Sequence, residues 1–348
     1  MVSITFDLET VTPLFLGGAD QQNAELRPPA FRGALRYWFR AIIGGYYWQN
    51  TQKLKDIESS IFGDTSEQNG SSKIVLRLSK YSPNSRPSEV KQIHDLEGLK
   101  YLWFSMKMTN RKAIGAEEPA SFSLTFSTRP NPRIAEQQQK NLLILANCFW
   151  FAVNLGGFGS RERRGAGSLR ILKATSQGLN SEFEKKLPRF TTNLKPEDVK
   201  KYFKGEIRKI QRNCKELLGI TESPKWDGTE LPDFEIYRQD LTKIYRISTP
   251  YSSWEEALND IGQEYSSYRK NYRLQERFIF GLPLTKVDMK LRRPSPLRIK
   301  IIQSVKDYYC FLIRTYANFP ERFSMDDLSH YQLIDNFINS LEDIEEVV

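Results

Sequence analysis

One stretch limits what this chain can fold into more than any other: residues 156–168, which read GGFGSRERRGAGS. An apolar segment of helical length, 134–154, precedes it, and a short strand-like run, 168–174, follows it. A glycine-rich loop in this position can adopt positive φ and approach a ligand closely. Arginine side chains add forked donors that suit phosphate oxygens. We therefore predict that this loop binds the backbone of a polynucleotide.

The loop does not match the nucleotide-binding loops whose spacing is well defined. A Walker loop requires Gly-Lys followed by Ser or Thr, and the sequence contains no such triplet. A dinucleotide fingerprint starting at Gly157 would need a third glycine where Glu162 stands, and it would open a helix instead of following one. A helix cap and a solvated surface are simpler interpretations, but no cap needs so many glycines. The loop residues predicted to contact the polynucleotide are Gly157, Phe158, Gly159, Arg161, Arg163, Arg164 and Gly165.

The charge of the chain also favours a polyanionic partner. The net charge is +9, although the segment 323–348 holds seven acids and no Lys or Arg. A basic body suits nucleic acid or an anionic membrane surface, and charge alone does not choose between them. The acidic end is expected to contact protein or to stay solvated.

Simple features exclude several classes of protein. The chain opens on an alternating, strand-like run instead of a signal peptide. Its longest apolar window, 142–153, is too short to span a bilayer. The three cysteines lie far apart, which supports neither a disulfide framework nor a zinc site. We expect a cytoplasmic protein that needs no membrane, metal or cofactor.

The segment 28–45 predicts a basic helix with prolines at its start and glycines at its end. An apolar stripe along it should pack in the core. Arginines recur every four residues beside that stripe, so they share one face of the helix. Two interpretations stay open: a face that contacts phosphates, or a solvated face paired with acids elsewhere in the fold. The candidate RNA contacts here are Arg27, Arg32, Arg36 and Arg40.

The order of the elements predicts the fold class. Runs at 2–10, 73–79, 99–106 and 121–128 alternate as strands or are otherwise strand-like, and with the two helices and the run 168–174 they follow the split βαβ pattern of a ferredoxin-like domain. We place this domain at 1–177 and a partly helical connecting insertion at 178–240. A second, degraded ferredoxin-like domain is predicted at 241–348, with a basic turn that adds Arg292 and Arg293 to the RNA-binding candidates. The predicted class is α+β.

These features together resemble the RAMP superfamily of CRISPR RNA-binding proteins, through the loop GGFGSRERRGAGSL and the N-terminal TPLFLGG. Within it, the chain resembles the first subunits of Cmr (type III-B) effector complexes. That likeness rests on AELRPPAFRGALRYWFRA, SSIFGD, GLKYLWFS, IFGLPL and RRPSPLRIKI, which occur in this order. The resemblance covers most of the chain and is weakest from about 178 to 233.

The resemblance implies two ferredoxin-like folds and a non-catalytic role in antiviral defence. The implied partners are CRISPR guide RNA, target RNA and the other Cmr subunits, near the end of the complex distal to the guide 5′ tag. Glu162 departs from commoner versions of the loop; it should pair with an arginine or mark protein contacts.

Two other functions stay open. Some RAMP proteins cut RNA with a histidine base, but the two histidines, His94 and His330, lie far from the first helix in the sequence. Asp56, Glu58 and Asp64 are too loosely grouped to predict a metal-dependent nuclease. The third possibility is a protein-only scaffold whose basic faces meet acidic subunits.

Overall fold

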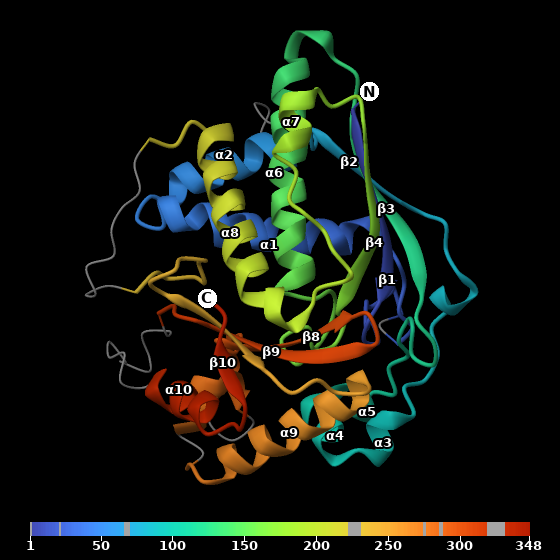
Figure 1. The fold of residues 1–348 in the computed structure, drawn as a ribbon, viewed down its shortest axis with the longest axis vertical. Coiled ribbons are helices and arrows are strands. Elements are labelled where there is room, and N and C mark those ends of the chain that lie inside the picture. The colour runs from blue at the N-terminus through green and yellow to red at the C-terminus, as the bar shows by residue number, and fades with distance from the viewer. Residues whose placement is uncertain are drawn as a thin grey trace.

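The computed structural model describes residues 2–20, 22–65, 70–221, 231–273, 276–284, 288–318 and 331–348; for 282–284 and 288–292 it describes the backbone only. Two four-stranded antiparallel sheets organise these residues (Figure 1). The first sheet has the order β2-β3-β1-β4 and the second β10-β5-β9-β8. Each is the arrangement that a ferredoxin-like βαββαβ chain produces, so the predicted α+β class is confirmed.

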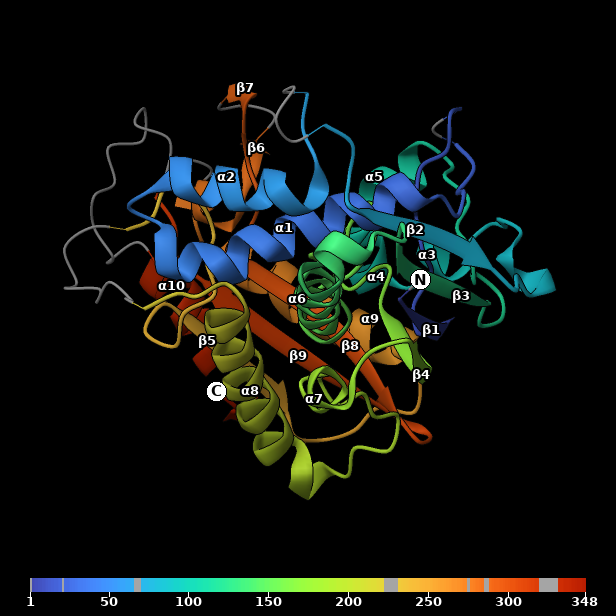
Figure 2. The same cartoon turned by 90° about the horizontal axis from the view of Figure 1, so that it is seen from above.

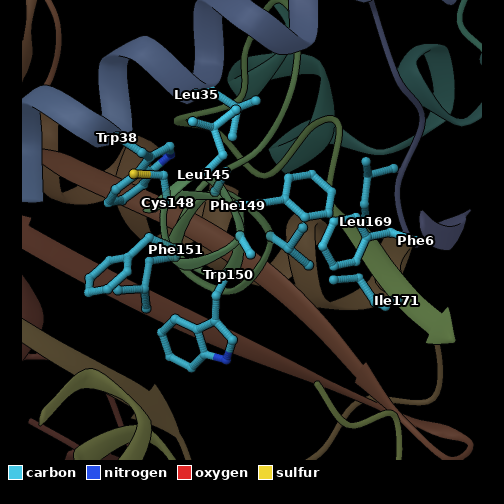
Figure 3. Close-up of a cluster of buried hydrophobic side chains, with 14 of the residues drawn as sticks. Phe6, Leu35, Trp38, Leu145, Cys148, Phe149, Trp150, Phe151, Leu169 and Ile171 are labelled. Carbon is cyan, nitrogen blue, oxygen red and sulfur yellow. The ribbon is translucent and has the colours of Figure 1, made fainter. Parts of the chain in front are cut away.

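The first unit follows the predicted order of elements closely, because its strands alternate and its second helix is strongly apolar. Its main elements are β1 (Ser3–Thr10), α1 (Pro28–Tyr47), β2 (Ile74–Ser79), β3 (Ser121–Thr128), α6 (Ala135–Asn154) and β4 (Leu169–Gln177). Helices α1 and α6 cover one face of the sheet. Figure 3 shows part of this core, where Phe149 of α6 lies beside Phe6 of β1, with ring centroids 4.7 Å apart.

The second unit is more complete than the sequence predicts. It comprises β5 (Thr242–Ile247), α9 (Trp254–Lys270), β8 (Leu297–Ser304), β9 (Asp307–Thr315), α10 (Gln332–Asn339) and β10 (Ile344–Glu346). The hairpin of β8 and β9 was expected, whereas β10 was not. A short ribbon of β6 (Leu282–Leu284) and β7 (Asp288–Arg293) precedes the hairpin.

The acidic end of the chain pairs with basic strands of its own sheet. Glu345 lies 2.7 Å from Arg246, and Glu346 lies 2.6 Å from Lys243, both across the β10–β5 pair. Asp335 of α10 lies 2.8 Å from Arg314 of β9. These acids therefore neutralise local positive charge, and β10 closes the sheet at its edge.

Several helices lie outside the two ferredoxin-like patterns. The segment 99–106 was predicted as a strand, and this was wrong: it forms α4 (Glu97–Leu102) and the start of α5 (Phe104–Met108), after the short α3 (Gln92–Asp95). Helix α4 packs against α9, where a Cβ on Gly98 would lie 1.9 Å from the Asn259 carbonyl oxygen. The remaining helices are α2 (Thr51–Phe62), α7 (Ser181–Lys185) and α8 (Val199–Leu217).

The second sheet is covered on both faces, as Figures 1 and 2 show together: α6 and α8 lie on one side, and α9 and α10 on the other. On β9, Phe311 belongs to the core of the first unit and stacks near Phe203 of α8, with centroids 5.3 Å apart. Its neighbour Leu312 belongs to the core formed with α9 and α10. The two units thus share a sheet-on-helix interface. In the described residues, each helix is too short or too polar to cross a bilayer.

Candidate nucleic-acid interface

The loop 156–168 has the tight backbone that its glycines predict. Gly159 has φ +85° and Gly165 has φ +80°, both in the left-handed region. A Cβ on Gly165 would lie 2.4 Å from Leu258 Cδ2 of α9, so only glycine lets the two units approach this closely. Arg161 has φ +62° without being glycine, a strained conformation that the surrounding contacts must hold in place.

Arg163 is committed to a buried ion pair. Its guanidinium donates to both carboxylate oxygens of Glu235, at 2.5 and 2.6 Å, and to the Ser295 carbonyl oxygen at 2.6 Å. The Tyr37 hydroxyl also donates to Glu235. Burial alone would raise the pKa of Glu235, but Arg163 and Arg298 lower it to about 2. The carboxylate therefore stays ionised. Glu235 lies in the insertion, and its bonds to Tyr37 and Arg163 connect the insertion to α1 and to the loop.

Arg164 is surrounded by neutral groups. Its guanidinium donates to the carbonyl oxygens of Leu297 at 2.9 Å and Phe280 at 3.1 Å, and it lies 4.9 Å from the centroid of the Tyr265 ring. Burial, together with the positive charge of Arg269, lowers the pKa of Arg164. The side chain therefore connects the loop to the second unit without a balancing carboxylate among the described residues.

The loop also pairs with the edge of the second sheet. The Ile299 amide donates to the Arg163 carbonyl oxygen at 3.1 Å, in a parallel bridge between Arg164 and Ile299. Glu162 accepts from Arg298 of β8, so the expectation that this acid pairs with an arginine is confirmed. The loop therefore forms the junction between the two units.

Phe158 was predicted to contact RNA, and the structure corrects this. Its ring is 1% exposed and lies 5.0 Å from the Phe31 ring of α1, measured between centroids. The ring packs among apolar side chains beneath the loop, in the core, where no base can reach it. Gly157 is buried in the same place, with the Ala166 carbonyl oxygen 2.9 Å from where its Cβ would stand.

The four candidate arginines of this region, Arg27 just before α1 and three within it, separate into two kinds. Arg36 and Arg40 both approach Glu58 of α2, at 3.4 and 3.7 Å, and Arg36 also donates to the Gly63 carbonyl oxygen. Arg40 nevertheless keeps 51% of its side chain exposed. Arg27 is exposed and Arg32 half-buried, and neither has an ion-pair partner within the described ranges.

One of the two arginines predicted in the basic turn of the second unit is buried. Arg293 is 8% exposed and donates to the Ala317 carbonyl oxygen at 2.8 Å and to the Tyr331 hydroxyl, so its guanidinium serves the fold. The side chain of Arg292 lies outside those that the structure describes. His330 also lies outside the described residues, and His94 is exposed on α3. No cluster of three metal-ligating side chains occurs in the described part of the chain.

A pocket of about 620 Å³ opens where the loop meets the second unit. Arg161, Arg163 and Arg164 of the loop line it together with Arg269 of α9. Phe104 of α5 also lines it and is 50% exposed. The sequence shows the loop arginines, but it does not show Arg269 or Phe104 as neighbours, because each comes from an element distant in the chain. Glu235 was missed for the same reason.

Paired ferredoxin-like units joined at a glycine- and arginine-rich loop define a RAMP protein. Residues 7–170 match the family model of the RAMP superfamily. Among its relatives is "CRISPR system Cmr subunit Cmr1-2" of Pyrococcus furiosus, which is 32% identical over 182 residues, covering 49% of this chain and 96% of that protein. "CRISPR system Cmr subunit Cmr1-1" of the same organism is 28% identical over 307 residues, covering 86% of this chain and 82% of that protein. The chain belongs to the Cmr1 family of CRISPR Cmr subunits.

Solved structures share the whole fold. The crystal structure of Cmr1 from Pyrococcus furiosus in its apo form matches with a TM-score of 0.70 and 25% identity, covering 100% of this chain and 99% of that one. A chain of a type III-B Cmr-beta complex bound to cognate target RNA matches with a TM-score of 0.55 and 12% identity, covering 97% of this chain and 99% of that one. The latter likeness concerns the fold alone.

Proposed function

We propose that this protein is a non-catalytic, RNA-binding subunit of a type III-B Cmr effector complex. It contacts guide and target RNA near the end of the complex distal to the guide 5′ tag, and it acts in the cytoplasm in antiviral defence. Support comes from its membership of the Cmr1 family and from a fold shared with a chain of a Cmr-beta complex bound to target RNA.

The proposal rests on a difference among the arginines: some hold the two units together, and others are open to solvent. Arg163 and Arg164 hold the two units together through Glu235 and the Leu297 carbonyl oxygen, so they shape the surface at the junction. Arg27, just before α1, and Arg32 and Arg40 within it keep guanidinium groups available to solvent. Several guanidinium groups along and just before one helix, beside a rigid loop, suit the regularly spaced phosphates of a nucleic-acid strand.

The open face of the first sheet is an unsuitable site for RNA. In RNA-recognition motifs this face carries aromatic side chains on which bases stack. Here the strand positions on that face carry Thr5, Asp7 and Glu9 in the central strand, opposite Ser123 and Thr125 of β3. No aromatic residue occupies the strand positions of this face, so bases have no ring to stack on there, and RNA should bind through α1 and the junction instead.

Salt dependence of RNA binding tests the proposal. Each phosphate contact to single-stranded RNA contributes about −0.7 to the slope of log affinity against log salt. The triple variant Arg27→Gln, Arg32→Gln and Arg40→Gln should therefore make the slope shallower by about 2. A matched control removes three charges from the other side, with Arg77→Gln, Lys80→Gln and Lys173→Gln, and should leave the slope nearly unchanged.

If both triple variants change the salt slope equally, RNA binding depends only on net charge, and a site on α1 is refuted. Cleavage of labelled RNA by the purified protein would favour the endoribonuclease alternative. If neither variant changes the slope, but the protein still joins a Cmr complex prepared without guide RNA, the scaffold alternative holds.

A further inference from the structure

The pocket at the junction holds positive charge that the described residues do not balance. Arg163 is neutralised by Glu235, and Arg298 by Glu162. Arg161, Arg164 and Arg269 have no carboxylate within ion-pair distance in the described part of the chain. Their polar partners are neutral: Ser105 for Arg161, backbone carbonyls and Tyr265 for Arg164, and Tyr101 for Arg269.

One of these guanidinium groups also has an unused buried donor. Arg269 Nε is buried and makes no hydrogen bond to a described residue. The same guanidinium lies 5.5 Å from the Tyr265 ring centroid and 5.3 Å from that of Phe280. Cations removed from water without a counter-ion are costly unless an anion joins them. The pocket is therefore built for an anionic group that enters between the two units.

The mouth of the pocket offers an apolar surface beside these charges. Phe104 is 50% exposed, and the Arg161 guanidinium lies 5.0 Å from its ring centroid. One turn further along α5, Met108 is 76% exposed. An exposed aromatic ring next to an arginine is a stacking surface for a nucleobase. The volume of about 620 Å³ falls within the range of small-molecule pockets, about 300–1,000 Å³.

We propose that this pocket binds the terminal phosphomonoester of an RNA strand on Arg161, Arg164 and Arg269, while the last base stacks on Phe104. A phosphomonoester carries a charge of about −1.5 to −2 at pH 7, whereas an internal phosphodiester carries a single charge. Three uncompensated guanidinium groups that line one pocket match the more highly charged group. The proposal rests on the proposed RNA-binding function and adds a preference for strand ends.

The test compares the affinities of matched tetrauridylates for the full-length protein by calorimetry: one with hydroxyls at both ends, one with a 5′-phosphate and one with a 3′-phosphate. One phosphorylated strand should bind about tenfold more tightly than the hydroxyl strand at pH 8, as expected for charge-assisted hydrogen bonds. Because the second pKa of the phosphate is about 6, the preference should shrink at pH 5.5. The arginines of the pocket do not titrate in this range.

Variants locate the effect. Arg269→Gln should reduce the preference for a phosphorylated end to about twofold or less. Phe104→Ala removes a ring that is 50% exposed, and it should weaken the phosphorylated strand most. Arg32→Gln on α1 serves as the control and should weaken all three strands alike. Equal binding of the three strands, or a preference that survives both pocket variants, would overturn the proposal and leave RNA binding intact.

Failure of every strand to bind would instead refute the proposed function itself. Uridine monophosphate and inorganic phosphate complete the series and identify the source of the ligand. If uridine monophosphate binds as tightly as the phosphorylated strand, the pocket takes a free nucleotide and a strand end is ruled out as its specific ligand. If inorganic phosphate alone binds as tightly as the nucleotide, the stacking role of Phe104 is refuted.

Discussion

The carboxylate of Glu235 should be among the most consequential single groups at the junction. It accepts hydrogen bonds from both terminal nitrogens of Arg163 at 2.5 and 2.6 Å, and Arg298 Nη2 lies 3.5 Å away. Removing one partner of a buried ion pair leaves the other charge uncompensated and typically costs about 3–5 kcal/mol. Glu235→Gln keeps the shape of the side chain but removes its charge, so we expect a loss of about 3 kcal/mol in the free energy of unfolding.

The lowered pKa of Glu235 leads to a magnitude of the same size, from the same ion pairs. Lowering it from an ordinary value of about 4.3 to about 2 corresponds to about 3 kcal/mol of stabilisation by the ionised form. The stabilisation is complete above about pH 4.3, because the folded protein then holds the carboxylate and the unfolded chain would also be ionised. It is lost as the pH falls through about 2. Glu235→Gln should therefore flatten the pH dependence of stability between pH 5 and 2.

Urea denaturation followed by tryptophan fluorescence measures both effects, since the buried Trp38 ring lies 5.3 Å from the Arg298 guanidinium. Glu346→Gln is the matched control: in its pair with Lys243 the two side chains are 49% and 35% exposed, and solvent-accessible pairs contribute about 0–1 kcal/mol. Equal losses in the two variants, or a Glu235→Gln loss below about 1 kcal/mol, would show that Arg163 is not held by this carboxylate.

Two further predictions concern buried positions at the same interface. Gly165→Ala should lower the free energy of unfolding in urea by at least about 1–3 kcal/mol, because the residue has a positive φ and its Cβ would clash with Leu258. Adding Leu258→Ala should recover part of this loss. No recovery would show that backbone strain alone is responsible. Burial lowers the pKa of Lys300 to about 7, and its amine makes no hydrogen bond to a described residue. The unfolded chain therefore binds more protons between pH 7 and about 10.4, so stability rises with pH there. Lys300→Met should raise the free energy of unfolding at pH 6 by about 1–4 kcal/mol and abolish that rise, and an unchanged pH profile would contradict a buried amine.

The parts of the fold that follow from local pattern were predictable. The alternation of β3 and the long apolar run of α6 mark the first ferredoxin-like unit directly in the sequence. The segment 99–106 was misread because its apolar residues suit a strand as well as a helix, and packing of Gly98 against Asn259 decides for the helix. The strand β10 was missed because it is short and acidic. Its acids form ion pairs with Arg246 and Lys243, which only the fold brings beside it.

The sequence predicts which residue types form the candidate site, but it does not predict how they are arranged. The sequence identifies a loop rich in glycine and arginine, and the structure shows it as a junction. What each guanidinium does depends on acceptors far away in the sequence: Glu235 lies 72 residues after Arg163, the Leu297 carbonyl 133 residues after Arg164, and Ser105 56 residues before Arg161. No pattern within the loop distinguishes Arg163, which is neutralised, from Arg161, which is not.

The bridge between Arg164 and Ile299 has a consequence for how the molecule is made. During synthesis the loop leaves the ribosome well before the strand that receives it, so the nascent first half carries guanidinium groups whose acceptors have not yet been translated. Water must solvate those groups until the hairpin of β8 and β9 emerges. The junction therefore cannot be completed before β8 has been translated.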